Sequence, residues 1–323
     1  MLKLDIVANY LGQAWSALMG LAFVPMYIKY LGIEAYGLIG IFAVLNAWFS
    51  LLDLGMTPTL GREMARFTGG SQSVESIRDL LRSIELITFF ITLVIVVAFG
   101  FSADWVATSW LRSITLPRHD ISQSVAIMGL VGALRFVETI YRSSILGLQR
   151  QVLFNFVNSI LATLRGLGAL VILGWISSSI QVFFLWQGFL SIITVIIFAA
   201  ITYSSLPPIR RRARFSIEAL REVCRFMVGM LGITFLALLL IHVDKVMLIK
   251  LLNLREYGYY ALACAVAGVV YMLVTPITQA VYPRMCELRA SVNDRLINQA
   301  FHLSAQLVTI CAGSFSILLI FLC

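Results

Sequence analysis

The sequence predicts an all-α, polytopic membrane protein built from two related helix bundles. The 323-residue chain is 60% hydrophobic and 12% charged, with a mean hydropathy of +0.93, which places it outside the range of soluble domains. Apolar runs such as residues 91–97 are apolar on every side, whereas a strand of a membrane barrel would alternate with a period of two. A short sequence motif that recurs in the second half of the chain indicates the two bundles.

The two copies of the recurring motif are offset by 221 residues, the difference between positions 29 and 250. Lys29 and Lys250 each stand seven residues before a Tyr-Gly pair. Paired bundles of membrane helices usually move something across a bilayer. The Tyr-Gly pairs are Tyr36-Gly37 and Tyr257-Gly258, and further identities at the same offset are Leu31 with Leu252 and Met64 with Met285.

Nine mostly apolar stretches of about 18 to 25 residues are each long enough to cross a bilayer as a helix. The first carries Asn9 and Gln13 and lacks a small-x-small cleavage site, so we expect it to stay as a signal anchor. Pro25, Pro58 and Pro276 lie within or at the ends of these stretches and mark expected bending points. The nine stretches lie near 6–28, 37–60, 84–101, 121–146, 152–174, 180–203, 226–249, 258–281 and 303–323.

The stretches group into two unequal lobes. Residues 1–205 are predicted to form an N-terminal six-helix lobe, residues 206–225 a basic cytoplasmic linker, and residues 226–323 a partial C-terminal lobe of three helices. At the offset of the repeat, a complete second lobe would end near residue ~424, so about 100 residues and three helices are expected beyond position 323. We therefore expect the chain to be inactive alone unless a separate piece supplies the rest.

The basic residues predict the orientation of the chain in the membrane. The N-terminus and the loops after the second, fourth, sixth and eighth helices carry sixteen basic residues, and the opposite side carries five. The N-terminus is therefore expected to face the cytoplasm, and the net charge of +8 requires no nucleic acid partner. The sixteen are Lys3, Arg62, Arg66, Arg78, Arg82, Arg142, Arg150, Arg210, Arg211, Arg212, Arg214, Arg221, Arg225, Arg284, Arg289 and Arg295, and the five are Lys29, Arg112, Arg118, Lys250 and Arg255.

The sequence offers no catalytic residues, metal site or cofactor. The five cysteines form no C-x-x-C pair, and His119, His242 and His302 are too far apart to indicate a local ligand cluster. A phosphate-binding G-x-x-x-x-G-K-[ST] loop is absent, and residues 166–168 are a lone Gly-Leu-Gly rather than a dinucleotide fingerprint. We therefore expect a protein that is not an enzyme and is not powered by nucleotide bound to this chain.

Charged residues at bilayer depth are the candidate functional residues, because each one facing lipid costs roughly 2.5 to 3.5 kcal/mol at the helix centre. Arg135, Glu138 and Arg142 recur on one face of the fourth helix, where Glu138 can pair with either arginine. Arg165 lies about midway along the fifth helix. The fork of an arginine suits phosphate oxygens, so we expect Arg135, Glu138 and Arg165 to line a cationic cavity for an anionic, phosphorylated cargo. A buried structural pair is the alternative for Arg135 with Glu138. Arg142 is instead expected to extend to the head groups.

Other polar residues are expected to line the same cavity. Asn155 and Asn158 share a helix face with Arg165, and Asn9 and Gln13 form a polar face on the first helix. For Asn9 and Gln13, hydrogen bonding between helices is as good an explanation as contact with a sugar.

Three acidic or basic residues are candidates for coupling or gating. Asp53 could pair with an arginine of the cavity, bind a coupling cation, or satisfy the backbone loosened by Pro58. Asp244 and Lys245, near the outer end of the seventh helix, are either a self-paired couple or part of a gate.

A family resemblance rests on five runs of residues, which are Tyr30–Gly37, Leu52–Leu60, Arg62–Arg66, Asp244–Met247 and Glu256–Tyr260. These runs resemble the bacterial polysaccharide flippases of the O-antigen (Wzx) type. The resemblance covers essentially the whole chain and implies a MATE-like two-lobe helix bundle of the multidrug/oligosaccharidyl-lipid/polysaccharide exporter superfamily. It also implies a place in the cell inner membrane, where family members carry an undecaprenyl-diphosphate-linked oligosaccharide from the inner to the outer leaflet, as in lipopolysaccharide biosynthesis. Alternating access, with one bundle rocking against the other about the prolines, is expected from the repeat itself. Implied partners are membrane lipid and the polysaccharide polymerase and chain-length proteins.

Two other functions remain open on the sequence. A cation-coupled multidrug or small-molecule exporter of the same superfamily would need an acidic pocket for cationic drugs, whereas this chain has a surplus of arginine. A nonfunctional truncated fragment is the other alternative. A purely structural scaffold would have no need of arginines at mid-membrane.

Overall fold

The all-α class is confirmed in the computed structural model of the chain, which describes residues 2–68, 70, 72–111, 116–208, 211 and 213–268 and scattered residues between 298 and 317. Within these residues every regular element is a helix, and residues 254–268 are helical as well. The helices are α1 (Leu2–Ala22), α2 (Val24–Leu31), α3 (Ile33–Leu52), α4 (Met56–Thr68), α5 (Val74–Ser109), α6 (Arg118–Gly147), α7 (Gln151–Trp175), α8 (Ile180–Ser205) and α9 (Ile217–Leu251).

Seven segments of the described chain are long and apolar enough to cross a membrane, and in order they coincide with the first seven predicted stretches. Helices are required there because a bilayer offers no water to backbone N–H and C=O groups. Helix 254–268 covers the first part of the eighth predicted stretch. The remainder of that stretch, including Pro276, and most of the ninth lie outside the described residues.

Two predicted helices are interrupted. The first is broken at Phe23, and Pro25 lies in the first turn of α2, at the bending point expected from the sequence. The second, predicted as one helix over 37–60, is two: α3 ends at Leu52 and α4 begins at Met56. Between them the backbone turns through left-handed conformations, with φ of 51° at residue 54 and 77° at residue 55. The prediction of a single continuous helix was therefore wrong. It arose because the residues across the turn are largely apolar, so hydropathy shows no break there.

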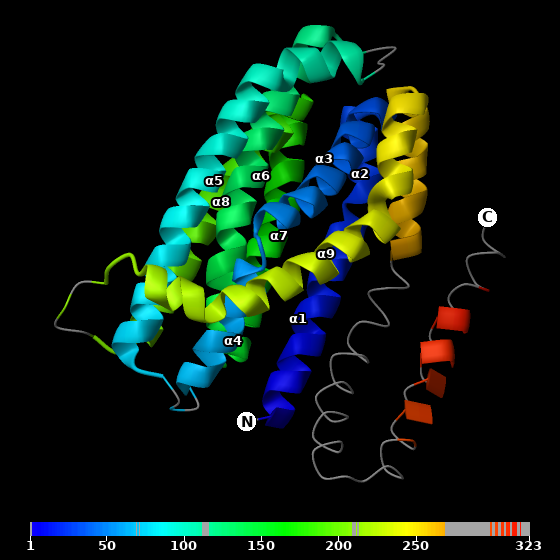
Figure 1. The fold of residues 1–323 in the computed structure, drawn as a ribbon. Helices are drawn as coiled ribbons and strands as arrows, with labels where there is room; N and C mark the ends of the chain where they lie inside the picture. Colours follow the sequence, from blue (N-terminus) through cyan, green and yellow to red (C-terminus); the bar gives the residue numbers. More distant parts are fainter. Residues whose placement is uncertain are drawn as a thin grey trace.

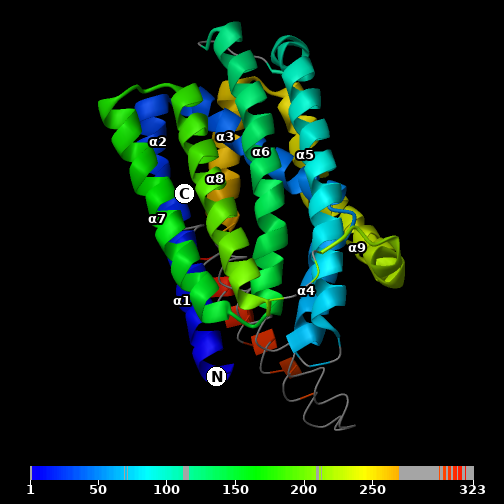
Figure 2. The same cartoon turned by 90° about the vertical axis from the view of Figure 1, so that its left-hand side faces the viewer.

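Helix α6 lies at the centre of the N-terminal bundle. It packs against α3, α4, α5, α7 and α8, and Figure 2 shows α7, α8, α6 and α5 standing side by side. Small residues allow this close approach: a Cβ on Gly132 would overlap the ring of Phe49, and one on Gly129 would overlap Phe99. The bundle is closed by α1 and α7, which contact each other along their length.

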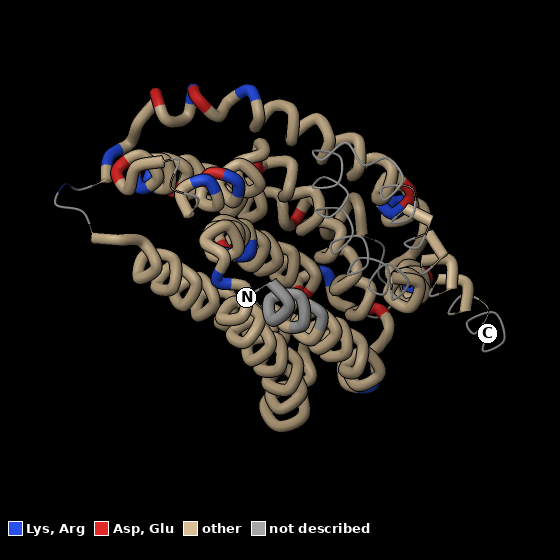
Figure 3. The backbone as a smooth tube through the Cα atoms, turned by 90° about the horizontal axis from the view of Figure 1, so that it is seen from below, with Lys and Arg blue, Asp and Glu red and all other residues tan. Residues whose placement is uncertain are grey.

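Helix α9 differs from the others in lying obliquely across the bundle (Figure 1). It contacts α3, α4 and α5, yet few of its residues are buried. It begins at Ile217, so the last part of the predicted linker 206–225 belongs to its first turns. Seen from the N-terminal end, long runs of the helices carry no charged residue (Figure 3), as expected for surfaces that face lipid.

Candidate functional site

Two arginines are held in the interior of the bundle by residues of neighbouring helices. Arg165 of α7 donates from Nη2 to Glu138 Oε2 of α6 at 2.8 Å and to Thr194 Oγ1 of α8 at 3.1 Å. Arg135 of α6 donates from Nη2 to Gln187 Oε1 of α8 at 3.1 Å. Helices α6, α7 and α8 therefore bring together the three charged residues predicted to line a cavity, and we name Arg135, Glu138 and Arg165 the arginine cluster.

The arginine cluster is net positive and keeps unused hydrogen-bond donors. A single carboxylate, Glu138, accompanies two guanidinium groups, and in the described part of the chain the Nε groups of both arginines are buried without an acceptor. The guanidinium of Arg135 also lies 5.0 Å from the centre of the Phe42 ring, a favourable cation–π contact. The side chains of Arg165 and Glu138 are 21% and 14% exposed, so they are reachable rather than sealed in the core. Because the Nε groups are buried, an anion with several oxygens would satisfy them once the arginine side chains turn toward it.

The partner of Glu138 is a residue that the pattern along α6 does not indicate. The sequence allows Glu138 to pair with Arg135 or Arg142 on its own helix, but its ion pair is with Arg165 on α7. Arg142 is exposed, and its guanidinium lies 5.2 Å from the centre of the Phe154 ring. The position of Arg142 near the end of α6 agrees with the expectation that it extends to the head groups.

The amides of α1 and α7 meet at the interface between these helices. Asn155 Nδ2 donates to Asn9 Oδ1 at 2.5 Å, and Asn158 Nδ2 donates to Ser16 Oγ at 3.2 Å. Gln13 lies between them on α1 and is partly buried. Interhelical hydrogen bonding, one of the two explanations drawn from the sequence, is therefore present. Contact of these amides with a sugar stays a prediction.

Asp53 caps the N-terminus of α4. Its carboxylate accepts the Thr57 N–H at 3.0 Å and the Thr57 hydroxyl at 2.6 Å, while its carbonyl oxygen accepts the Met56 N–H at 2.8 Å. Asp53 is 7% exposed. Pro58 lacks a backbone N–H, so the N–H groups that need acceptors at the start of α4 are those of Met56 and Thr57. The bonds to Asp53 supply an acceptor for both. Of the three roles expected for Asp53 this one is visible, and the arginine partner and the coupling cation stay predictions.

The cap predicts different effects for two substitutions of Asp53. Asp53→Asn keeps an acceptor oxygen and is expected to change the free energy of unfolding little, whereas Asp53→Leu removes the cap and is expected to cost about 1 to 2 kcal/mol. Thermal unfolding of the purified protein in detergent measures both. Equal destabilisation by the two variants would contradict the capping role, because the amide side chain preserves the geometry of the bond.

Asp244 and Lys245 bond to different partners. The Tyr260 hydroxyl donates to Asp244 Oδ2 at 2.7 Å, and Lys245 Nζ donates to the carbonyl oxygen of Ile241 at 3.1 Å. The ion pairs found among the described residues do not include one between Asp244 and Lys245. The Asp244 bond ties α9 to helix 254–268, which is compatible with the gating role that remains a prediction for both residues.

The two copies of the recurring motif are in contact with each other. A Cβ on Gly37 would lie 2.7 Å from the carbonyl oxygen of Leu254, and a Cβ on Gly258 would overlap the carbonyl oxygen of Ile33. At the offset of the repeat, Ile33 is equivalent to Leu254 and Gly37 to Gly258. The two contacts are therefore copies of one another.

The next turn continues this symmetry. A Cβ on Gly40 would lie 2.5 Å from the Cβ of Ala261, and positions 40 and 261 are themselves equivalent in the repeat. A pseudo-twofold axis therefore passes between α3 and helix 254–268, which is drawn yellow to orange beside the blue helices in Figure 1. Small residues at this crossing let the two backbones approach closely. We name the contact formed by Ile33, Gly37, Gly40, Leu254, Gly258 and Ala261 the repeat contact.

Some residues of the site escaped sequence analysis. Gln187 and Thr194 on α8 hold the two arginines, and their only signal in the sequence is polarity inside an apolar stretch. Tyr260 belongs to the run Glu256–Tyr260 that carries the family resemblance, but nothing in the sequence marks its hydroxyl as the partner of Asp244. Among the described residues, no group of three or more His, Cys, Asp and Glu side chains is placed to hold a metal ion.

The fold, with its seven helical segments long and apolar enough to cross a membrane, defines an all-α, multi-pass membrane protein. The structure of the MATE multidrug transporter DinF-BH resembles it with a TM-score of 0.69 and 14% sequence identity, over 97% of this chain and 71% of that one. The chain belongs to the polysaccharide biosynthesis protein family, whose model matches residues 2–289. The family and the MATE-like fold predicted from the sequence are thereby confirmed. No curated protein sequence matches the chain significantly.

Proposed function

We propose that this protein is a flippase that carries an undecaprenyl-diphosphate-linked oligosaccharide from the cytoplasmic to the periplasmic leaflet of a bacterial inner membrane. The observation that carries the proposal is the arginine cluster, a net positive group on three candidate membrane spans, α6, α7 and α8, in a member of a polysaccharide biosynthesis family. Charges in such a position are expensive and mark a path for a charged cargo. The cargo diphosphate supplies the acceptor oxygens that the Nε groups of Arg135 and Arg165 lack.

Alternating access between the two lobes is the proposed mechanism. With the N-terminus in the cytoplasm, the repeat contact lies at the periplasmic end and holds the lobes together there. The arginine cluster then receives the diphosphate from the cytoplasmic side, and separation of α3 from helix 254–268 releases it outward. The oligosaccharide delivered in this way is substrate for a polysaccharide polymerase and its chain-length partner.

The second candidate is export of a small molecule, favoured by the resemblance in fold to a multidrug transporter. A cationic cargo would be repelled by the two arginines, which have a single carboxylate beside them. An anionic small molecule would meet the same donors as a diphosphate. The two candidate functions therefore differ in the cargo and require an experiment in cells.

Deletion of the chromosomal gene separates these functions. For a flippase we expect lipid-linked oligosaccharide to accumulate on the cytoplasmic face and polysaccharide to disappear from the cell surface, with both restored by the gene supplied in trans. For a drug exporter, the deletion would leave polysaccharide unchanged and increase the sensitivity of the cells to toxic small molecules. Unchanged polysaccharide would overturn the flippase proposal whatever the drug phenotype.

A further inference from the structure

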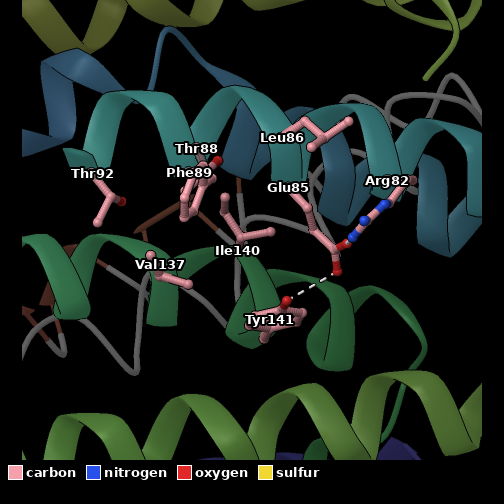
Figure 4. Close-up of a pocket in the computed structure, with 9 residues that line it drawn as sticks. All are labelled: Arg82, Glu85, Leu86, Thr88, Phe89, Thr92, Val137, Ile140 and Tyr141. Carbon is pink, nitrogen blue, oxygen red and sulfur yellow. Dashed lines mark hydrogen bonds and ion pairs between the residues drawn. The ribbon is translucent and has the colours of Figure 1, made fainter. Parts of the chain in front are cut away.

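A groove on the outer face of the bundle is separate from the arginine cluster. It lies between α5 and α6 (Figure 4) and encloses a volume of about 400 Å³. On α6 it is lined by Val137 and Ile140, whereas Arg135 and Glu138 belong to the cluster described above. Phe89, on the rim of the groove, is 63% exposed, so the groove opens toward the surface that faces lipid.

Away from the end formed by Arg82, Glu85 and Tyr141, the wall of the groove is apolar except for two hydroxyl groups. Thr88 and Thr92 stand one helical turn apart on α5 and both line the groove. Among the described residues their Oγ1 atoms have no hydrogen-bond partner, and both atoms are buried. Threonines elsewhere in the fold, such as Thr59, donate to the carbonyl oxygen one turn earlier. A ligand with acceptor oxygens beside an apolar chain would satisfy the two free hydroxyls.

One end of the groove is cationic. Arg82 donates from Nη1 to Glu85 Oε2 at 3.1 Å, and its side chain is 49% exposed, which leaves further N–H groups free to bind. Glu85 is fully engaged, since it also accepts the hydroxyls of Tyr141 at 3.0 Å and Tyr203 at 2.7 Å. One turn before Arg82, Arg78 adds a second positive charge and donates to a backbone carbonyl. Within the lining of the groove Arg82 is balanced by Glu85. Arg78 lies just outside the lining, and because Asp79 beside it is paired with Arg211, Arg78 gives this end a net positive charge that attracts an anion.

We propose that the groove is a binding site for an anionic phospholipid. Its phosphate lies on Arg82, its ester oxygens accept from Thr88 and Thr92, and an acyl chain runs along Leu86, Phe89, Val137 and Ile140. Arg82 and Thr88 are six residues apart on α5, about 9 Å along the helix axis, which a glycerophosphate and the long arginine side chain span together. The site lies on the side of the net basic N-terminal loops, where anionic head groups gather. It is independent of the proposed cargo.

Native mass spectrometry of the purified protein with added phosphatidylglycerol or phosphatidylethanolamine tests the site. We expect the wild-type protein to retain phosphatidylglycerol in preference, and Arg82→Gln to reduce that preference about fivefold, the effect of losing one cationic contact. Val137→Trp fills the groove without changing its charge and is expected to reduce retention of both lipids. Arg150→Gln, an exposed arginine away from the groove, is expected to behave as wild type.

Two results would overturn the site. If Arg82→Gln and Val137→Trp both keep the wild-type preference, the lipid binds elsewhere. If Arg150→Gln loses the preference as strongly as Arg82→Gln, the attraction is a property of the whole basic surface and not of the groove. Thr88→Val with Thr92→Val gives an independent reading, because it removes the hydroxyls alone and should weaken binding of both phospholipids.

Discussion

Replacing Arg165 by lysine is expected to lower surface polysaccharide at least about tenfold while the protein accumulates normally in the membrane. A lysine keeps the charge beside Glu138 but offers no fork to a diphosphate, and the lost charge-assisted hydrogen bonds are each worth about 1.5 to 3 kcal/mol. Quantitative blotting of membranes, together with measurement of surface polysaccharide, reads both effects from variants in the chromosomal gene. Arg142→Gln, at the exposed arginine over Phe154, is the matched control and is expected to retain export.

The ion pair itself requires a separate test, because a buried pair can be structural. Arg165→Ala leaves the Glu138 carboxylate without its partner and is expected to cost about 3 to 5 kcal/mol, so lost export alone would be ambiguous. Replacing both residues by methionine removes the unpaired charge. We expect the double variant to recover its abundance but not its export. Recovery of both would contradict cargo binding and leave the pair a purely structural one.

The sequence was informative where the bilayer dictates the answer. Spans that must be helical and apolar were placed correctly through α9, whereas the turn at Asp53 was missed because an apolar stretch continues through it. The break between α3 and α4 consists of two residues in left-handed conformation. Local hydrogen bonds and the packing of Gly55 against α9 determine this break, and hydropathy records neither of them. The spacing of polar residues shows which face of a helix is polar, but it does not show which other helix packs against that face.

The arginine cluster illustrates this limit. The sequence placed Arg135, Glu138 and Arg165 at bilayer depth, because charge there is costly whatever the fold. It did not predict that Glu138 turns to α7, or that Gln187 and Thr194 on α8 complete the site. These choices depend on which helices are neighbours, and that is settled by packing around α6. The residue types could be predicted, and their partners could not.

The repeat shows a second limit. The recurring Tyr-Gly motif indicates two copies of one unit, but a sequence repeat does not show whether the two copies are in contact. In the structure they meet through Gly37 and Gly258, and the equivalence of the two contacts follows from the offset of the repeat. Glycine in both copies thus has a physical reason, since any side chain at either position would overlap the backbone of the other lobe.

A disulfide across the repeat contact is expected to stop export completely and reversibly. In a protein whose native cysteines are replaced by serine, Gly40→Cys with Ala261→Cys places two Cβ atoms 2.5 Å apart, so a shift of about 1 to 1.5 Å gives disulfide geometry. The bond would hold α3 against helix 254–268 and keep this end of the protein closed. Surface polysaccharide should therefore fall to the level of the deletion strain after oxidation and return after reduction.

A disulfide inside the N-terminal lobe provides the control for that experiment. A Cβ on Gly61 of α4 would lie 3.9 Å from the Cβ of Ser143 on α6, so Gly61→Cys with Ser143→Cys should form a disulfide with little distortion. Because α4 and α6 belong to one bundle, export is expected to continue when this pair is oxidised. Continued export with the bond across Gly40 and Ala261 fully formed would show that the lobes need not separate at the repeat contact. The cargo would then have to leave by a path that does not pass between α3 and helix 254–268.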